Sequence, residues 1–342
     1  MGWRESITKV LAGKVGGPWE GGIRAYHSSP HDFDKVDFSK LRTGEGANMY
    51  GAGHYMAENP AVSGQGGQYW NQFLSRFPEA ERDAAKSLQI NKFDREQAAA
   101  NLRSEMADTR QRAAQKNEYW ERPEYRDAHY ANILRRQQEE LDALLRGGPV
   151  GPRTYEMNLR AKPEELLDWD KPMTAQPGVT AKINDELERR IVRNHPDWRT
   201  YSVMQDDLAT TTGEEAYKLL ASKDVANMGQ LGASTFLRDL DIPGIRYLDE
   251  GSRRPVQLHL TDLDRPETLD FRSLPDAQAW LTKAGKTADS PGVRLVESPQ
   301  THNYVGTDPS KLDILAKYGV AGAAAVPPTL GAFTAQDQYE AR

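Results

Sequence analysis

The strongest constraint on the backbone of this chain is a short run in which two glycines flank one small residue and an aromatic follows. Residues 50–55 read Tyr-Gly-Ala-Gly-His-Tyr. Because glycine has no Cβ, Gly51 and Gly53 let the backbone approach a ligand closely. The ring of Tyr55 can then lie flat against a planar group. Upstream, a short apolar run predicts a strand that carries His27 to the edge of a sheet.

Composition limits the classes of chemistry. The 342 residues are enough for one large domain or two ordinary ones. The net charge of −6 argues against a nonspecific nucleic-acid clamp, which needs a basic face. The absence of cysteine excludes a disulfide framework, a thiolate metal site and a cysteine nucleophile. The sequence holds no Gly-x-x-x-x-Gly-Lys phosphate loop and no His, Asp and Glu group with metal-ligand spacing.

Helical and strand-like segments can be placed along the chain. Residues 77–146 are rich in Ala, Gln, Glu, Arg and Lys and predict a long helical segment, broken near its middle by Pro123. The capping-box spacing of Thr212 and Glu215 predicts the start of a helix. Residues 154–159 alternate with the period of a strand.

The region after these segments is more polar. Residues 241–249 predict a turn and then a strand, because glycine after proline supplies the turn. A polar insertion at residues 250–300 is expected to contain a strand at 256–260 and a helix at 276–284. Trp169 is assigned to packing, since a lone tryptophan is more often core than ligand site.

Three motifs resemble those of the ADP-ribosyltransferase superfamily, on its diphtheria-toxin and poly(ADP-ribose)-polymerase side. Residues 26–29, Tyr-His-Ser-Ser, resemble its first motif, and residues 51–57, Gly-Ala-Gly-His-Tyr-Met-Ala, resemble its second. Residues 301–308 resemble the third, with Asn303 where the polymerases have a glutamate. More narrowly, the string that starts at His27, His-Ser-Ser-Pro-His-Asp-Phe-Asp, is similar to the ADP-ribosyltransferase domain of phage and prophage polyvalent proteins.

The resemblance implies an α+β fold, namely an ADP-ribosyltransferase-like split β-sandwich of two small sheets with flanking helices and a long helical insertion. The domain is expected to span residues 22–318, with the insertion at about 71–148. Residues 1–21 are expected to form an N-terminal docking segment. Residues 319–342 are expected to form a tail of small apolar residues, shorter than a bilayer span, so no transmembrane segment is expected.

The resemblance also implies a site for NAD as substrate. Its binding residues are expected to be His27, Ser28, Ser29, Gly51, Gly53, Tyr55, Ser63 and Tyr69. Its catalytic residues are expected to be His27, Tyr55, Asn303 and Glu58. We expect the imidazole of His27, the phenol of Tyr55 and the amide of Asn303 to converge on one crevice sized for a pyridine and its ribose.

Asn303 raises a question about mechanism. Cleavage between nicotinamide and ribose passes through an oxocarbenium-like transition state, as in glycoside hydrolysis. A carboxylate would stabilise that positive charge, but Asn303 carries none. Glu58, Glu250 or Glu297 could supply it; otherwise the protein transfers a single ADP-ribose slowly or only binds the dinucleotide.

Two functions follow as expectations. The first is a phage- or prophage-encoded mono-ADP-ribosyltransferase that uses NAD to modify a host macromolecule. A host protein is the favoured acceptor. The second is a virion structural or ejected protein that keeps the fold without catalysis; Asn303 and the docking-like ends favour it. Either function places the protein in the virion, the host bacterial cytoplasm or both, with phage virion proteins as further partners and no specific nucleic acid.

Overall fold

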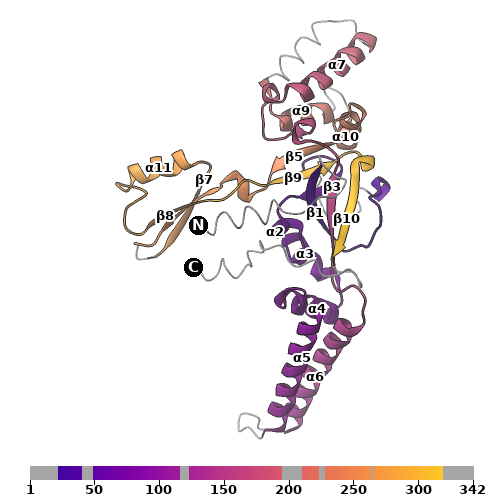
Figure 1. Ribbon diagram of the computed structural model, residues 1–342, viewed down its shortest axis with the longest axis vertical. Helices are drawn as coiled ribbons and strands as arrows, with labels where there is room; N and C mark the ends of the chain where they lie inside the picture. Colours follow the sequence, from indigo (N-terminus) through magenta and orange to yellow (C-terminus); the bar gives the residue numbers. More distant parts are fainter. Residues whose placement is uncertain are drawn as a thin grey trace, which may run out of the picture.

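The computed structural model describes residues 22–40, 49–115, 123–194, 210–222, 228–262 and 265–318. The expected docking segment and C-terminal tail lie outside these residues. The chain has a seven-stranded sheet and a separate three-stranded sheet, together with helices, which confirms the predicted α+β class. Figure 1 shows the large sheet at the centre, helices at both ends of the long axis and the small sheet to one side.

The large sheet is continuous, whereas the expectation was two small sheets. Its strand order is β10-β3-β1-β2-β9-β5-β4. Neighbours are antiparallel except β4 and β5, which run parallel. The strands are β1 (Ile23–Ser29), β2 (His54–Ala57), β3 (Arg153–Leu159), β4 (Leu167–Asp168), β5 (Gly244–Leu248), β9 (His302–Gly306) and β10 (Leu312–Tyr318). The strands predicted before His27, at 154–159 and within 241–249 are therefore present.

Strand β3 lies inside the protein on both faces. Tyr155 and Met157 have no exposed surface on one face, and Glu156 is buried on the other. A buried carboxylate must be paired. Glu156 forms an ion pair with Arg24 and accepts a hydrogen bond from the phenol of Tyr318.

A group of helices packs at the β5 end of the large sheet (Figure 1). These helices are α7 (Pro177–Asn194), α9 (Gly213–Ala221) and α10 (Gly229–Asp239). Trp169 is 3% exposed in the core that they form with the sheet, as its assignment to packing predicted. The capping box at the start of α9 is also confirmed: Thr212 accepts from the backbone of Glu215, whose carboxylate accepts from the backbone of Thr212.

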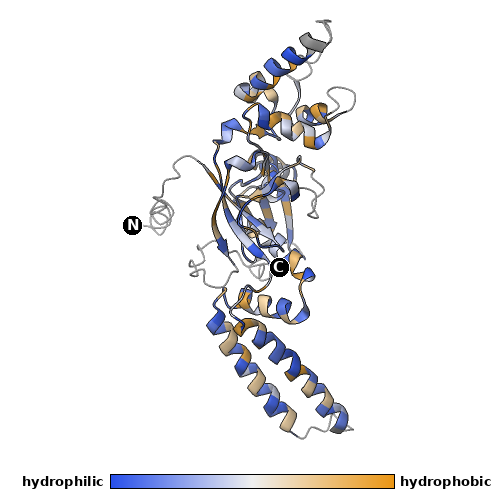
Figure 2. Ribbon diagram, turned by 90° about the vertical axis from the view of Figure 1, so that its right-hand side faces the viewer, coloured by the Kyte–Doolittle hydropathy of each residue, from blue (hydrophilic) through white to orange (hydrophobic). Residues whose placement is uncertain are grey.

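The segment predicted to be helical projects from the opposite end of the sheet (Figure 1). The helices before β3 are α2 (Pro60–Ser63), α3 (Gln68–Phe73), α4 (Glu79–Ile90), α5 (Arg95–Ala114) and α6 (Pro123–Leu145). Pro123, the predicted break, begins α6, and the buried faces of α5 and α6 meet at Leu102, Met106, Leu141 and Leu144. Figure 2 shows hydrophilic residues over much of this pair. No helix in the described ranges is long and apolar enough to cross a bilayer.

The small sheet is inserted in the chain between β5 and β9, so both of its connections lead to adjacent strands of the large sheet (Figure 1). Its strand order is β7-β6-β8. Its elements are β6 (Val256–Leu260), β7 (Glu267–Phe271), α11 (Leu274–Lys283) and β8 (Val293–Glu297). The predicted strand at 256–260 is β6, and the predicted helix is α11. Strands β7 and β8 were not predicted, because each is five residues long and its apolar residues are only partly buried.

Candidate functional site

The register of the large sheet sorts the expected site residues onto two opposite faces. Tyr26 of β1 lies opposite Ala57 of β2, which in turn lies opposite Asn303 of β9. Opposed residues point to the same side of a sheet, and successive residues alternate. Tyr55 and Asn303 therefore share one face, which we call the tyrosine face. His27 lies on the other, which we call the histidine face.

Four tyrosines gather around Asn303 on the tyrosine face. We call this group the tyrosine cluster: Tyr50, Tyr55, Tyr69, Tyr247 and Asn303. Tyr247 lies opposite Asn303 in the β5–β9 register, and its ring stacks on Tyr50 with centroids 3.7 Å apart. The phenol of Tyr55 donates to the carbonyl oxygen of Gly51 at 2.7 Å. Tyr69, on α3, is 45% exposed, so the cluster has buried walls and an aromatic that solvent reaches.

The cluster contains no charged side chain, and one of its buried hydrogen-bond acceptors is without a partner among the described residues. Burial raises the pKa of Tyr247, and the neighbouring phenols of Tyr55, Tyr69 and Tyr50 raise it further. The side chain of Asn303 acts in the opposite direction, through a hydrogen bond to Tyr247. The Oδ1 atom of Asn303 is buried and has no hydrogen-bond partner within the described part of the chain. Such an unpaired group costs about 1–3 kcal/mol, so a ligand that donates a hydrogen bond to it would be favoured.

His27 lies among other rings on the histidine face. Its ring centroid is 4.2 Å from that of His54 and 6.1 Å from that of Tyr155. Its Nδ1–H donates to the backbone carbonyl of Tyr55 at 2.8 Å. Burial lowers the pKa of His27 to about 4, and burial together with the His27 ring lowers the pKa of His54 well below its usual value. The expected convergence of this imidazole with Tyr55 and Asn303 is wrong, because a strand period of two turns them to opposite faces.

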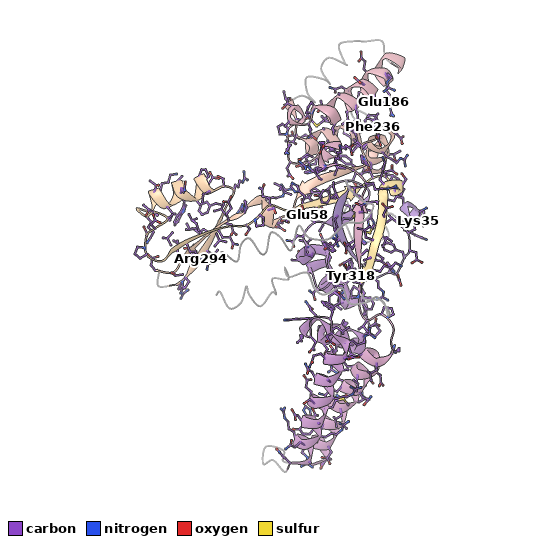
Figure 3. The ribbon with its side chains drawn as sticks, in the orientation of Figure 1. Lys35, Glu58, Glu186, Phe236, Arg294 and Tyr318 are labelled. Carbon is purple, nitrogen blue, oxygen red and sulfur yellow. The ribbon has the colours of Figure 1, made fainter. Side chains whose placement is uncertain are left out.

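Glu58 is also on the histidine face. Its carboxylate accepts from the backbone N–H of His302 at 3.0 Å and from the phenol of Tyr304 at 3.5 Å. Hydrogen bonding to His302 lowers the pKa of Glu58. Figure 3 shows Glu58 on the side of the large sheet from which the chain leaves for the small sheet. The structure therefore does not bring Glu58 together with Tyr55 and Asn303.

The two glycines of the motif lie close to protein atoms. Gly51 has a φ of +107°, and a Cβ there would meet Ile245 at 2.8 Å and Tyr217 at 3.0 Å. A Cβ on Gly53 would lie 2.4 Å from the carbonyl oxygen of Gly306. The close approach that we predicted toward a ligand is thus an approach of the segment just before β2 to β9, β5 and α9.

The three serines divide between the faces. Ser28 is on the tyrosine face, and its hydroxyl donates to the carbonyl oxygen of Ser63 at 2.9 Å, which ties β1 to α2. Ser29 is on the histidine face, where its hydroxyl accepts from the backbone of His31 at 3.1 Å. Ser28 and Ser63 therefore lie on the same face as Tyr55, whereas Ser29 does not.

Two residues near the cluster were missed in the sequence. Tyr247 stands in the predicted strand 241–249, where strand period gives its face but not its neighbours. Arg253 lies in the 3-10 turn η5 (Gly251–Arg253) that follows. Its Nη1 donates to Asp170 Oδ1 at 2.7 Å, and its guanidinium lies close to the phenol of Tyr50. Its side chain is 39% exposed, so the cluster has a cation at its margin.

Other features give no competing site. Within the described ranges, no three His, Asp or Glu side chains come together as metal ligands. An open groove on α7 and α10, lined by residues that include Arg190, Leu231 and Phe236, shares no residue with the tyrosine cluster. In comparisons with known proteins, no family model, no curated protein and no solved structure matches the chain. The tyrosine cluster is thus the candidate site on its geometry alone.

Proposed function

We propose that the chain is an NAD-dependent mono-ADP-ribosyltransferase that modifies a host protein, and that the tyrosine cluster binds the nicotinamide and its ribose. The observation that carries the proposal is the buried, unpaired Oδ1 of Asn303 beside the ring of Tyr247. A ribose hydroxyl is a suitable donor for this oxygen. The pyridinium ring of NAD is planar and positively charged, and aromatic faces attract such a group.

The proposed reaction breaks the bond between nicotinamide N1 and ribose C1′. The electron pair of this bond goes to N1, which neutralises the pyridinium, and nicotinamide leaves. A lone pair on the acceptor heteroatom forms the new bond to C1′, and the acceptor proton is released to solvent. With water as acceptor, the same step gives free ADP-ribose.

The properties of the cluster suit a binding role more than a proton-transfer role. Burial raises the pKa values of Tyr55 and Tyr247 above the usual tyrosine value, so both phenols stay neutral at pH 7. Neutral rings can enclose a pyridine without competing as nucleophiles. Tyr69 is the exposed member and can stack on the outer side of the ligand.

A second function, a virion structural or ejected protein that keeps the fold without catalysis, is favoured by two observations. The ring of His27 lies on the histidine face, and Asn303 carries no charge. The two functions differ in outcome, since only the first releases nicotinamide.

The test uses NAD labelled in its adenylate part, with the full chain and a host bacterial lysate. Transfer of label to protein and release of nicotinamide are expected for the wild type. Tyr69→Ala should lower both by about 10- to 100-fold, the range for one stacked base. Tyr125→Ala removes a tyrosine that is 59% exposed on α6 and should have no effect. Absence of nicotinamide release, with or without NAD binding, would contradict the first function and support the second.

A further inference from the structure

The proposed cleavage lacks a carboxylate at position 303, and the three acids suggested by the sequence do not replace it. Glu58 lies on the histidine face, bonded to His302. Glu250 is exposed before η5, and Glu297 is exposed at the end of β8 in the small sheet. The transition state would therefore find no negative charge from any of them on the tyrosine face.

We propose that Asp249 is the carboxylate of this site, an inference that rests on the proposed function. Asp249 follows Tyr247 by two residues, so it lies on the same face. The pairing of β5 with β9 continues to it: its backbone N–H donates to the carbonyl oxygen of Thr301 at 3.2 Å. Thr301 precedes Asn303 by two residues, which makes Asp249 the diagonal neighbour of Asn303 across the two strands, about 7 Å away.

The carboxylate of Asp249 is held in place. Asp249 as a whole residue is 7% exposed. Oδ1 accepts from the backbone N–H of Ser252 at 2.7 Å, and Oδ2 accepts from the hydroxyl of Thr301. Ser252 in turn accepts from the backbone of Thr301 at 2.7 Å. A carboxylate that accepts two hydrogen bonds, from donors that are themselves hydrogen-bonded to each other, needs little reorganisation when positive charge develops nearby, which is the condition for electrostatic catalysis.

The charge of Asp249 favours the transition state over bound NAD. In NAD the positive charge is spread over the pyridinium ring, whereas in the transition state it moves onto the ribose. With the ribose bound at Asn303, one diagonal strand spacing of about 7 Å from Asp249, this attraction at an effective dielectric constant of about 20 corresponds to a rate factor of roughly 50. Binding of NAD should change much less.

Asp249→Asn tests the inference because it removes the charge and keeps the shape and an oxygen acceptor for Ser252. The rate of nicotinamide release should fall roughly 50-fold, and the Kd for NAD, measured by calorimetry, should change less than about fivefold. Glu297→Gln, which removes an exposed carboxylate from the small sheet, is the matched control and should change neither value. An Asp249→Asn protein with equal losses in affinity and rate, or with no loss, would overturn the inference.

A rescue separates charge from structure. Asn303→Asp in the Asp249→Asn background places a carboxylate on the adjacent strand of the same face, and should restore release at least about tenfold. A purely structural role for Asp249 predicts no rescue. If the wild type binds NAD and releases nicotinamide but Glu58→Gln alone abolishes release, the inference fails while the proposed function stands. If the wild type does not bind NAD, the proposed function fails and the inference fails with it.

Discussion

The ring of Tyr50 lies flat on the ring of Tyr247. The ring centroids are 3.7 Å apart, and the angle between the ring planes is 6°. The stack joins the start of the glycine motif to strand β5, two segments far apart in the sequence. Aromatic pairs of this kind contribute about 0.5–1.5 kcal/mol beyond their burial. Tyr247 therefore belongs both to the candidate site and to the core. Substitutions of this residue must distinguish its contribution to ligand binding from its contribution to stability.

Tyr247→Phe and Tyr247→Leu make that separation. Phenylalanine keeps the stack and loses only the hydroxyl beside Asn303, so the free energy of unfolding should fall by about 1 kcal/mol. Leucine loses the stack and leaves a void, so the fall should be about 2–4 kcal/mol. Urea denaturation measures both. Equal costs for the two variants would show that the stack contributes nothing.

The two partly buried imidazoles of His27 and His54 predict acid sensitivity. Burial lowers the pKa of His27 to about 4, against about 6.5 in the unfolded chain, and lowers that of His54 in the same direction. Between these values the unfolded state binds more protons than the folded state, so stability falls as the pH falls. His27 alone accounts for up to about 3 kcal/mol, lost from about pH 6.5 to about pH 4. Unfolding free energies measured across this range should show the fall.

A single substitution assigns that effect to the ring pair. The Nε2 atom of His54 is buried without a hydrogen-bond partner among the described residues, so His54→Leu should not lower stability at pH 7 by more than about 1 kcal/mol. It should make the acid loss shallower. His129→Leu, on the exposed side of α6, is the control and should leave the pH profile unchanged. An unchanged profile in His54→Leu would contradict the assignment.

Gly53→Ala tests the contact of β2 with β9. The added Cβ would lie 2.4 Å from the carbonyl oxygen of Gly306, so the strands must separate, and we expect a loss of about 2 kcal/mol or more in unfolding free energy. Gly148→Ala is the matched control, because nothing lies within 4 Å of a Cβ there. Thermal unfolding compares them. A Gly53→Ala protein as stable as Gly148→Ala would contradict the observed strand spacing.

Arg253→Gln tests the cation beside Tyr50. NAD has a diphosphate that a guanidinium can bind, and free nicotinamide does not. We expect the affinity for NAD to fall about tenfold, and the affinity for nicotinamide to stay within about twofold, in paired calorimetric titrations. The neighbouring, exposed Arg254→Gln should change neither. Equal loss for both ligands would indicate that Arg253 acts only through Tyr50.

The local structure could be read from the sequence where its signals are local. The capping box of Thr212 and Glu215, the break at Pro123 and the strand 256–260 depend on residues close in the chain, and the structure contains all three. Strands β7 and β8 were missed because each is only five residues long, and their apolar residues Leu269, Phe271, Val293 and Leu295 pack on a small core that exists only once β6 pairs with both.

The site was harder to predict because it depends on register between distant strands. The motif gave Tyr55 and Asn303, which share a face, but it could not give the β1–β2 pairing that turns His27 away. Tyr247 and Asp249 stand two residues apart in the strand predicted within residues 241–249. Only their pairing with the strand of Asn303 shows that they belong to its surroundings.

The most direct test of the account is a calorimetric titration of NAD into the wild-type chain and into Asn303→Leu. The unpaired Oδ1 is the proposed anchor for a ribose hydroxyl, so leucine should weaken NAD binding about 10- to 100-fold. The free energy of unfolding should change by no more than about 1 kcal/mol, because the variant removes a buried unpaired amide oxygen together with the hydrogen bond to Tyr247. Saturable binding by the wild type with that loss is the predicted result. No binding by the wild type, or equal affinity in both proteins, would contradict the claim that the tyrosine cluster is an NAD site.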